Sequence, residues 1–282
     1  MQALIAWIGL TLSCLATHLS AEPLPRPDKP TIPESSSWTE SLLSRVFLGH
    51  AVPAGANNWS CRPSHGENPV VLIHGTFSSS ALSFGALAPR LSNAGVCVFT
   101  LNYGGKSDSD WFQGVEAVDD SAQEVTRFIG LVKAATGARH VTLVGHSQGG
   151  LVGFYSLKFL GARQDVNRFI ALAPSVQGTR IAKTPKRSEV EYCLACADQH
   201  PKSDIVQSLR QGGITVPGVS YAVLASKNDQ VVLPVESQFV REPGVQNLYI
   251  QDVYPEKTVS HSGMLYDDDS LTLIVDLVLG RR

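Results

Sequence analysis

The sequence predicts an α/β fold in which a mostly parallel sheet of about six strands is covered by helices on both faces. Two observations predict it. From residue 69 onward, short apolar runs rich in β-branched residues alternate with longer amphipathic segments, as in parallel strands joined by crossover helices. The chain has 282 residues, of which 43% are hydrophobic and only 17% charged, so it can bury a large core.

The predicted strands are short apolar runs bounded by turn residues. They are 70–74, 96–103, 141–144, 169–173, 221–225 and 248–253. Each is separated from the next by a segment long enough for a crossover, so we expect the strands to be parallel.

The predicted helices lie between these strands and after the last one. They are 84–94, a segment from residue 115 to a closing Gly137, 149–160, 204–209 and 271–279. The longest helix has apolar residues at steps of three and four, which form one helical face. These are Val115, Val118, Ala122, Val125, Ile129 and Val132. Ser203 and Ser270 are the predicted N-caps of the last two helices.

The N-terminal region predicts export. Residues 3–16 form an apolar run of signal-peptide length, short of the roughly twenty residues that cross a bilayer. We expect a signal peptide over 1–21 that is cleaved after Ala21, and hence a secreted protein, extracellular or periplasmic. A retained anchor, or a lipid anchor on Cys14, is the alternative.

The mature chain is expected to have two parts. A Pro- and Ser-rich segment covers 22–58, with linker composition in its first half, and the main domain covers 59–282. Within that domain, 174–217 is a long polar insertion between the fourth and fifth strands, and it is a candidate cap.

Four cysteines remain after the signal peptide, an even number that is typical of disulfides in exported proteins. They allow three pairings, and the order of the predicted elements favours Cys61 with Cys97 and Cys193 with Cys196. A redox motif or a zinc site at Cys193-x-x-Cys196 with His200 is the alternative. Because no second cysteine pair completes a zinc tetrahedron, no metal is expected.

A Gly-x-Ser-x-Gly motif, residues 145–149, falls between the third predicted strand and its helix. In such a turn a nucleophilic serine adopts a strained backbone conformation, and the glycines avoid collisions with neighbouring backbone. The turn also places Ser147 at a helix N-terminus, where free N–H groups stabilise negative charge. Ser147 is the predicted nucleophile, and a tight turn with an incidental serine is the alternative.

A serine hydroxyl needs a general base, and with this turn the acid and then the histidine follow the serine in the sequence. Only His200 and His261 lie downstream of Ser147. His200 belongs to the insertion, whereas His261 follows the sixth predicted strand and precedes the last helix. His261 is therefore the predicted base.

Asp229 directly follows the fifth predicted strand, and it is the predicted acid that orients the imidazole. Asp252 is the main rival because it lies at the end of the sixth predicted strand. Asp204 and Glu236 are weaker rivals, expected to serve at a helix N-terminus and as a surface charge.

Two backbone N–H groups are expected to bind the oxyanion of a tetrahedral intermediate. One belongs to Gln148, which follows the nucleophile, and the other to Thr76, in the loop after the first strand. The Thr76 hydroxyl is a candidate third donor. His74 and His146 flank these loops and are expected to pack and hold turns rather than carry protons.

With these residues in place, the chain resembles the class 2 bacterial lipases of the α/β-hydrolase superfamily, the group of the small Bacillus lipases and the actinobacterial secreted lipases. The resemblance runs from about residue 59 to the C-terminus. It is carried by 69–76, 144–150, 173–174 with 178–179, 226–232 and 261–266.

The resemblance implies an α/β-hydrolase fold with a minimal or small cap and a site that needs no catalytic metal. It implies the triad Ser147, Asp229 and His261 and the oxyanion donors Thr76 and Gln148. These two donors also resemble the oxyanion hole of Candida antarctica lipase B. The insertion and the four mature cysteines are similar to the actinobacterial group and imply the two disulfides favoured above.

We therefore expect a secreted carboxylic-ester hydrolase, with triacylglycerol lipase or esterase activity, that acts through an acyl-enzyme on Ser147 without a cofactor. The expected partner is a lipid or small-molecule ester, and the expected form is a monomer. A net charge of −2 without a basic block predicts no nucleic-acid partner, and no stable membrane insertion is expected. The alternatives are another acyl-processing hydrolase or acyltransferase, for polyesters or thioesters, and a non-catalytic binding protein.

Overall fold

The structure is a computed structural model that describes residues 31–32, 35–48, 52–64, 67–107 and 110–282. The predicted signal peptide, with Cys14 and Ala21, lies outside these ranges. No helix within them is both long enough and apolar enough to span a bilayer.

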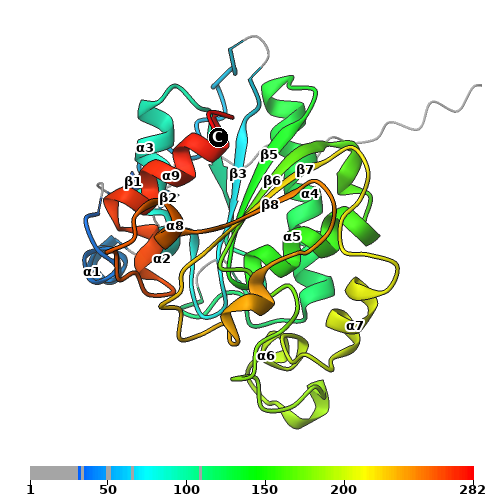
Figure 1. Cartoon of the computed structure of the whole chain (residues 1–282). Coiled ribbons are helices and arrows are strands. Elements are labelled where there is room, and N and C mark those ends of the chain that lie inside the picture. Colours follow the sequence, from blue (N-terminus) through cyan, green and yellow to red (C-terminus); the bar gives the residue numbers. More distant parts are fainter. Residues whose placement is uncertain (1–30, 33–34, 49–51, 65–66, 108–109) are drawn as a thin grey trace, which may run out of the picture.

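The main sheet has six parallel strands in the order β4-β3-β5-β6-β7-β8 (Figure 1), which confirms the predicted fold class. Its strands are β3 (Val70–Ile73), β4 (Val98–Thr100), β5 (Val141–His146), β6 (Val166–Leu172), β7 (Ser220–Ala225) and β8 (Val245–Tyr249).

Helices cover both faces of this sheet (Figure 1). Because successive strand side chains point to opposite faces, Val71 and Ile73 pack into the core beneath α4 and α5, whereas Val70 and Leu72 pack into the core beneath α3 and α9. The helices that cover the sheet are α3 (Leu87–Asn93), α4 (Val118–Thr136), α5 (Gln148–Phe159) and α9 (Asp268–Val278).

Several short helices lie in the connections. They are α2 (Ser80–Phe84), α6 (Leu194–Asp198), α7 (Asp204–Arg210), α8 (Ile250–Val253) and the 3-10 turns Ala162–Gln164, Arg187–Glu189, Val235–Gln238 and Gly263–Leu265. The insertion supplies α6 and α7, which lie together at one end of the molecule (Figure 1). As predicted, Ser203 caps α7, since its hydroxyl accepts a hydrogen bond from the Val206 N–H.

One predicted helix is divided into two. The sequence predicts a single helix over 84–94, but α2 ends at Phe84 and α3 begins at Leu87. Pro89 has no N–H to donate to the carbonyl of Gly85 four residues earlier, and that carbonyl accepts from the Ser35 N–H instead. The proline therefore accounts for the break.

The sixth strand exists, but its predicted bounds of 248–253 are wrong. The strand is β8, at the edge of the sheet, and residues 250–253 form α8. The Asp252 carboxylate accepts a hydrogen bond from the Tyr249 N–H and so caps the helical turn that ends the strand.

The predicted cap of the last helix is also wrong. Asp267 is the N-cap of α9, because its carboxylate accepts from both the backbone N–H and the hydroxyl of Ser270. Ser270 is the third residue of the helix, a position from which its N–H reaches back to the cap.

Part of the segment before residue 59 packs on the main sheet. β1 (Thr31–Ile32) pairs with β2 (Val52–Pro53), and α1 (Trp38–Leu48) packs against α2. Asn57 makes two hydrogen bonds to the backbone of Thr100 in β4, at 2.8 and 2.9 Å. These contacts extend the sheet edge to residues before the predicted boundary.

Both predicted disulfides are present. Cys61 is bonded to Cys97, and Cys193 to Cys196. The first ties the chain before β3 to the chain before β4, and the second closes the first turn of α6. Neither Cys193 nor Cys196 is therefore a free thiolate that binds zinc.

Candidate active site

Ser147 lies in the turn between β5 and α5, where it is the N-cap residue with φ of 57°. This left-handed region is strained for a residue with a Cβ and is concentrated at functional sites. The two motif glycines are required by close backbone approach. A Cβ on Gly145 would come within 2.5 Å of the Gly149 carbonyl oxygen, and a Cβ on Gly149 would overlap the Ile73 carbonyl oxygen.

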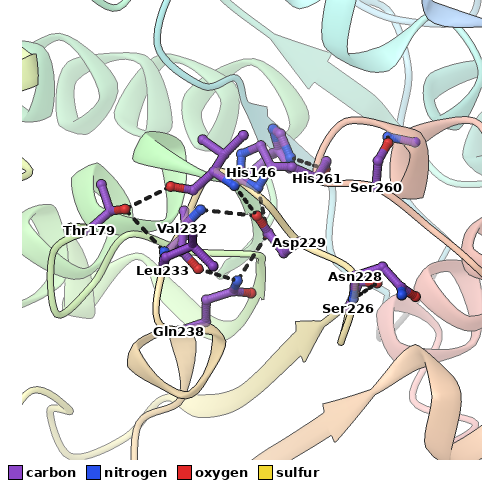
Figure 2. Close-up of polar contacts among 12 residues, drawn as sticks. His146, Thr179, Ser226, Asn228, Asp229, Val232, Leu233, Gln238, Ser260 and His261 are labelled. Carbon is purple, nitrogen blue, oxygen red and sulfur yellow. Dashed lines mark hydrogen bonds and ion pairs between the residues drawn. The ribbon is translucent and has the colours of Figure 1, made fainter. Parts of the chain in front are cut away.

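The structure brings Asp229 and His261 together, as predicted (Figure 2). The His261 Nδ1 lies 2.7 Å from the Asp229 Oδ2, and both side chains are buried. Asp229 follows β7, and His261 belongs to the loop before α9. A ring nitrogen bound to a carboxylate is the donor, so Nε2 is left as the proton acceptor.

The surroundings of Asp229 favour its charged form. Burial opposes ionisation of this carboxyl, but hydrogen bonds from the imidazole and two backbone N–H groups outweigh it and hold the pKa of Asp229 below its usual value. The backbone donors are Val231 and Val232, at 2.7 and 3.0 Å, and the Gln238 amide donates at 3.0 Å.

The rival acids lie elsewhere. Asp252 caps α8 and pairs with Lys227 at 3.1 Å, Asp204 is the first residue of α7, and Glu236 is in the 3-10 turn after Pro234. His200, in the insertion, accepts a hydrogen bond from the Lys202 N–H. The carboxylate paired with His261 is therefore that of Asp229.

His146 holds the loop that carries His261 (Figure 2). Its Nε2 donates to the His261 carbonyl oxygen at 3.0 Å, and the two ring centroids are 4.7 Å apart. Burial lowers the pKa of His146 to about 3, so the ring is neutral at ordinary pH. His74 is stacked on Tyr103 at 4.3 Å. Both contacts fit the packing roles predicted for these histidines.

The two predicted oxyanion donors lie in the loops beside Ser147. Gln148 is the first residue of α5, so its N–H has no partner within the helix. Thr76 follows β3, and within the described ranges no protein acceptor takes its N–H. Phe77, the next residue, has φ of 53°, a second strained conformation in the site.

Gln199, a residue that the sequence analysis did not single out, also reaches this loop. Its side-chain amide donates to the Thr76 hydroxyl oxygen at 2.8 Å. The two residues are 123 positions apart, so no local sequence signal identifies the contact.

A cavity of about 380 Å³ connects these groups. Ser147, His261, Thr76 and Gln199 line it, together with apolar side chains from the N-terminal helix, the loops and the insertion. These include Trp38, Phe77, Leu82, Ile181, Val231 and Leu265. A serine in a strained turn, a histidine paired with a carboxylate and the Thr76 loop thus meet in one largely apolar cavity, an arrangement suited to acyl transfer.

Similar solved structures share the fold. Lipase B of Aspergillus fumigatus is 24% identical with a TM-score of 0.62, and the match covers 80% of this chain and 54% of that one. The chain thus spans about half the length of the Aspergillus enzyme. The mature form of lipase BlEst2 from Bacillus licheniformis is 18% identical with a TM-score of 0.56, over 77% of this chain and 94% of that one.

A third similar structure is Est1E of Butyrivibrio proteoclasticus with bound ferulic acid, at 16% identity and a TM-score of 0.52, over 78% of this chain and 91% of that one. The sequence model of the class 2 lipase family matches residues 67–262, which confirms the resemblance stated above. Because this match covers well over half of the sequence, the chain belongs to the class 2 lipase family.

Proposed function

We propose that this protein is a secreted carboxylic-ester hydrolase that acts through an acyl-enzyme on Ser147. The observation that carries the proposal is the buried Asp229–His261 pair, whose histidine lines the same cavity as a serine in a strained strand-to-helix turn. The two disulfides are compatible with an oxidising, extracytoplasmic compartment.

In the proposed mechanism, the Ser147 Oγ attacks the ester carbonyl while the His261 Nε2 accepts the hydroxyl proton. The N–H groups of Gln148 and Thr76 bind the oxyanion. Collapse of the intermediate breaks the bond to the alcohol, which takes the proton from His261. Water, deprotonated by the same nitrogen, then attacks the acyl-enzyme and releases the acid and the free serine.

The mouth of the cavity favours a lipid-like ester. Trp38, Phe77, Ile181 and Val231 line the cavity and are each 37% to 52% exposed. Phe77 also packs edge-on against Phe112, which is 62% exposed. Such an apolar rim around an apolar cavity suits a long acyl chain that leaves a lipid surface, so we propose triacylglycerol as the substrate class.

The test is hydrolysis of p-nitrophenyl esters from acetate to palmitate, and of an emulsified triacylglycerol, by the mature protein. Ser147→Ala and His261→Ala are expected to lower kcat by about four to six orders of magnitude. Turnover of the palmitate ester and of the emulsion is expected from the wild type. Equal turnover by Ser147→Ala and wild type would contradict the acyl-enzyme, and hydrolysis of acetate alone would contradict the lipid substrate.

A further inference from the structure

We propose that Gln199 is a positioning residue that makes the Thr76 hydroxyl a third donor to the oxyanion. The inference rests on the proposed ester hydrolysis and adds to it a specific role for the insertion. Thr76, Gln199 and Ser147 line the same cavity.

The direction of the hydrogen bond between the two side chains is fixed by their surroundings. The Gln199 Nε2 lies 2.8 Å from the Thr76 Oγ1 and 3.1 Å from the Ala195 carbonyl oxygen. A carbonyl oxygen only accepts, so the group facing it must be the NH₂ end of the amide. That end only donates, and the Thr76 oxygen is therefore the acceptor.

This arrangement leaves the hydroxyl proton of Thr76 free to be donated. A hydroxyl has one proton and two acceptor lone pairs, and Gln199 occupies an acceptor position. The proton then points to another acceptor, and the oxyanion formed on the Ser147 adduct is the strongest one to enter the cavity. Gln199 thus selects the donor orientation before the substrate binds.

The position of Gln199 is itself fixed. The residue is 7% exposed, its backbone N–H donates to the Ala195 carbonyl, and its own carbonyl accepts from the Thr179 N–H at 2.8 Å. It directly follows α6, whose first turn is closed by the Cys193–Cys196 disulfide.

α6 is also anchored to the body of the protein. Asp198 is buried, and its carboxylate accepts from the Val118 N–H at the start of α4 and from Arg187 at 2.8 Å. The amide is therefore presented to the Thr76 loop by a rigid part of the insertion.

Two substitutions change the hydrogen bond in different ways. In Gln199→Met the donor is removed, and the Thr76 hydroxyl is free to rotate. In Gln199→Glu the ionised carboxylate can only accept a hydrogen bond. The Thr76 hydroxyl therefore donates to this carboxylate and is no longer available to the oxyanion. At pH 8, kcat is therefore expected to be highest in the wild type, lower in Gln199→Met and lowest in Gln199→Glu.

The experiment measures kcat and KM for p-nitrophenyl butyrate with the full mature protein. Gln199→Glu is expected to lower kcat by roughly 10- to 100-fold at pH 8 with little change in KM, since one oxyanion donor is lost. Gln207→Glu, the same substitution at an exposed position of the insertion, is the matched control and should keep wild-type kcat. Thermal unfolding of each variant checks that it is folded.

Two further measurements distinguish a positioning role of Gln199 from a general disturbance of the site. The ratio of Gln199→Glu to wild-type kcat should rise as the pH falls, because a protonated carboxyl again donates to Thr76. In a Thr76→Val background, itself expected to be up to about a hundredfold slower, Gln199→Glu should have no further effect on kcat.

Wild-type kcat in Gln199→Glu, or an undiminished loss in the Thr76→Val background, would overturn the positioning role. Either outcome refutes only the role of Gln199 if the wild type is active and Ser147→Ala is inactive. A wild type that hydrolyses no ester refutes the proposed function and this inference with it.

Discussion

At the scale of single residues, both oxygens of the Asp229 carboxylate accept hydrogen bonds in the described part of the chain. One oxygen accepts from two consecutive backbone N–H groups, and the other accepts from Gln238 and His261. The backbone donors fix the carboxylate, and the carboxylate fixes the imidazole tautomer. In the proposed mechanism, the charge of Asp229 therefore orients the base rather than moving a proton.

Asp229→Asn is expected to lower kcat for p-nitrophenyl butyrate by about three to four orders of magnitude with a small change in KM, because an amide no longer secures the Nδ1–H tautomer of His261. Asp252→Asn, at the rival carboxylate, is the control and should keep kcat within about twofold. Comparable losses in the two variants would mean that Asp229 is not the orienting acid.

Among the elements, the N-terminal helix α1 is notable because it lies before the residues that the family model matches and yet contributes to the cavity. Trp38, its first residue, is 43% exposed at the cavity mouth, and Tyr266 from the loop before α9 bonds to Ser41 of the same helix at 2.9 Å. The helix thus adds a wall to the site that the core fold alone lacks.

Trp38→Ala is expected to lower kcat/KM for the palmitate ester by about fivefold while that for the acetate ester stays unchanged. Only the long chain reaches the mouth, where loss of a half-buried ring costs roughly 1 kcal/mol. Leu43→Ala, an exposed apolar position on the same helix outside the cavity lining, is the matched control. A uniform decrease on all chain lengths would assign Trp38 to folding rather than to acyl binding.

Elements buried on both faces were the most predictable from sequence. β3, β5 and β7 are nearly continuous apolar runs, as expected for central parallel strands, and their predicted positions are confirmed. The edge strand β8 is only partly buried along most of its length, so its sequence has a weaker pattern of apolar residues. The predicted strand therefore began too late and included the residues of α8. The break between α2 and α3 at residues 85–86 was not predicted, because it depends on the single N–H that Pro89 lacks.

Within the site, Ser147, Asp229 and His261 were predictable because a local motif and a fixed chain order constrain them. Gln199 and Trp38 were not. Their positions depend on how the insertion and α1 pack onto loops far away in the sequence, and nothing in their local sequence distinguishes them from surface residues. Short-range rules were enough to predict the candidate triad, and tertiary packing determined the groups that surround it.

For the whole molecule, the insertion is tied to the body by charge. The Arg187 side chain bonds to the buried carboxylate of Asp198 and to Asp119 in the first turn of α4. Because Asp198 is buried, loss of Arg187 would leave the charge of this carboxylate uncompensated, so these contacts oppose separation of the insertion from the sheet. The network thus keeps Gln199 beside the loop that carries Thr76.

The two disulfides differ in what they contribute to the whole fold. Cys61–Cys97 joins residues 36 positions apart, whereas Cys193–Cys196 spans only three. By loop-closure entropy the first stabilises the folded state by about 4 kcal/mol and the second by about 2 kcal/mol. The Cys61–Cys97 disulfide therefore supports overall stability, and the Cys193–Cys196 disulfide mainly fixes the start of α6.

The stability of the whole molecule should depend on pH through His146. Its pKa is lowered by burial to about 3 in the folded state, against about 6.5 when unfolded. Between these values the unfolded chain binds one more proton, so the free energy of unfolding must fall as the pH decreases through this window. The full shift corresponds to at most about 4 to 5 kcal/mol.

His146→Asn, which does not titrate in this range, is expected to lose less free energy of unfolding than the wild type between pH 7.5 and pH 4.5. Urea denaturation at the two pH values measures this difference. Asp229, whose pKa is also lowered, contributes stability that is lost only below its unfolded value near 3.9, so it does not disturb this comparison. An identical decrease in both proteins would show that His146 is not the group that couples stability to pH; a smaller decrease in the variant assigns that coupling to the histidine that holds the catalytic loop.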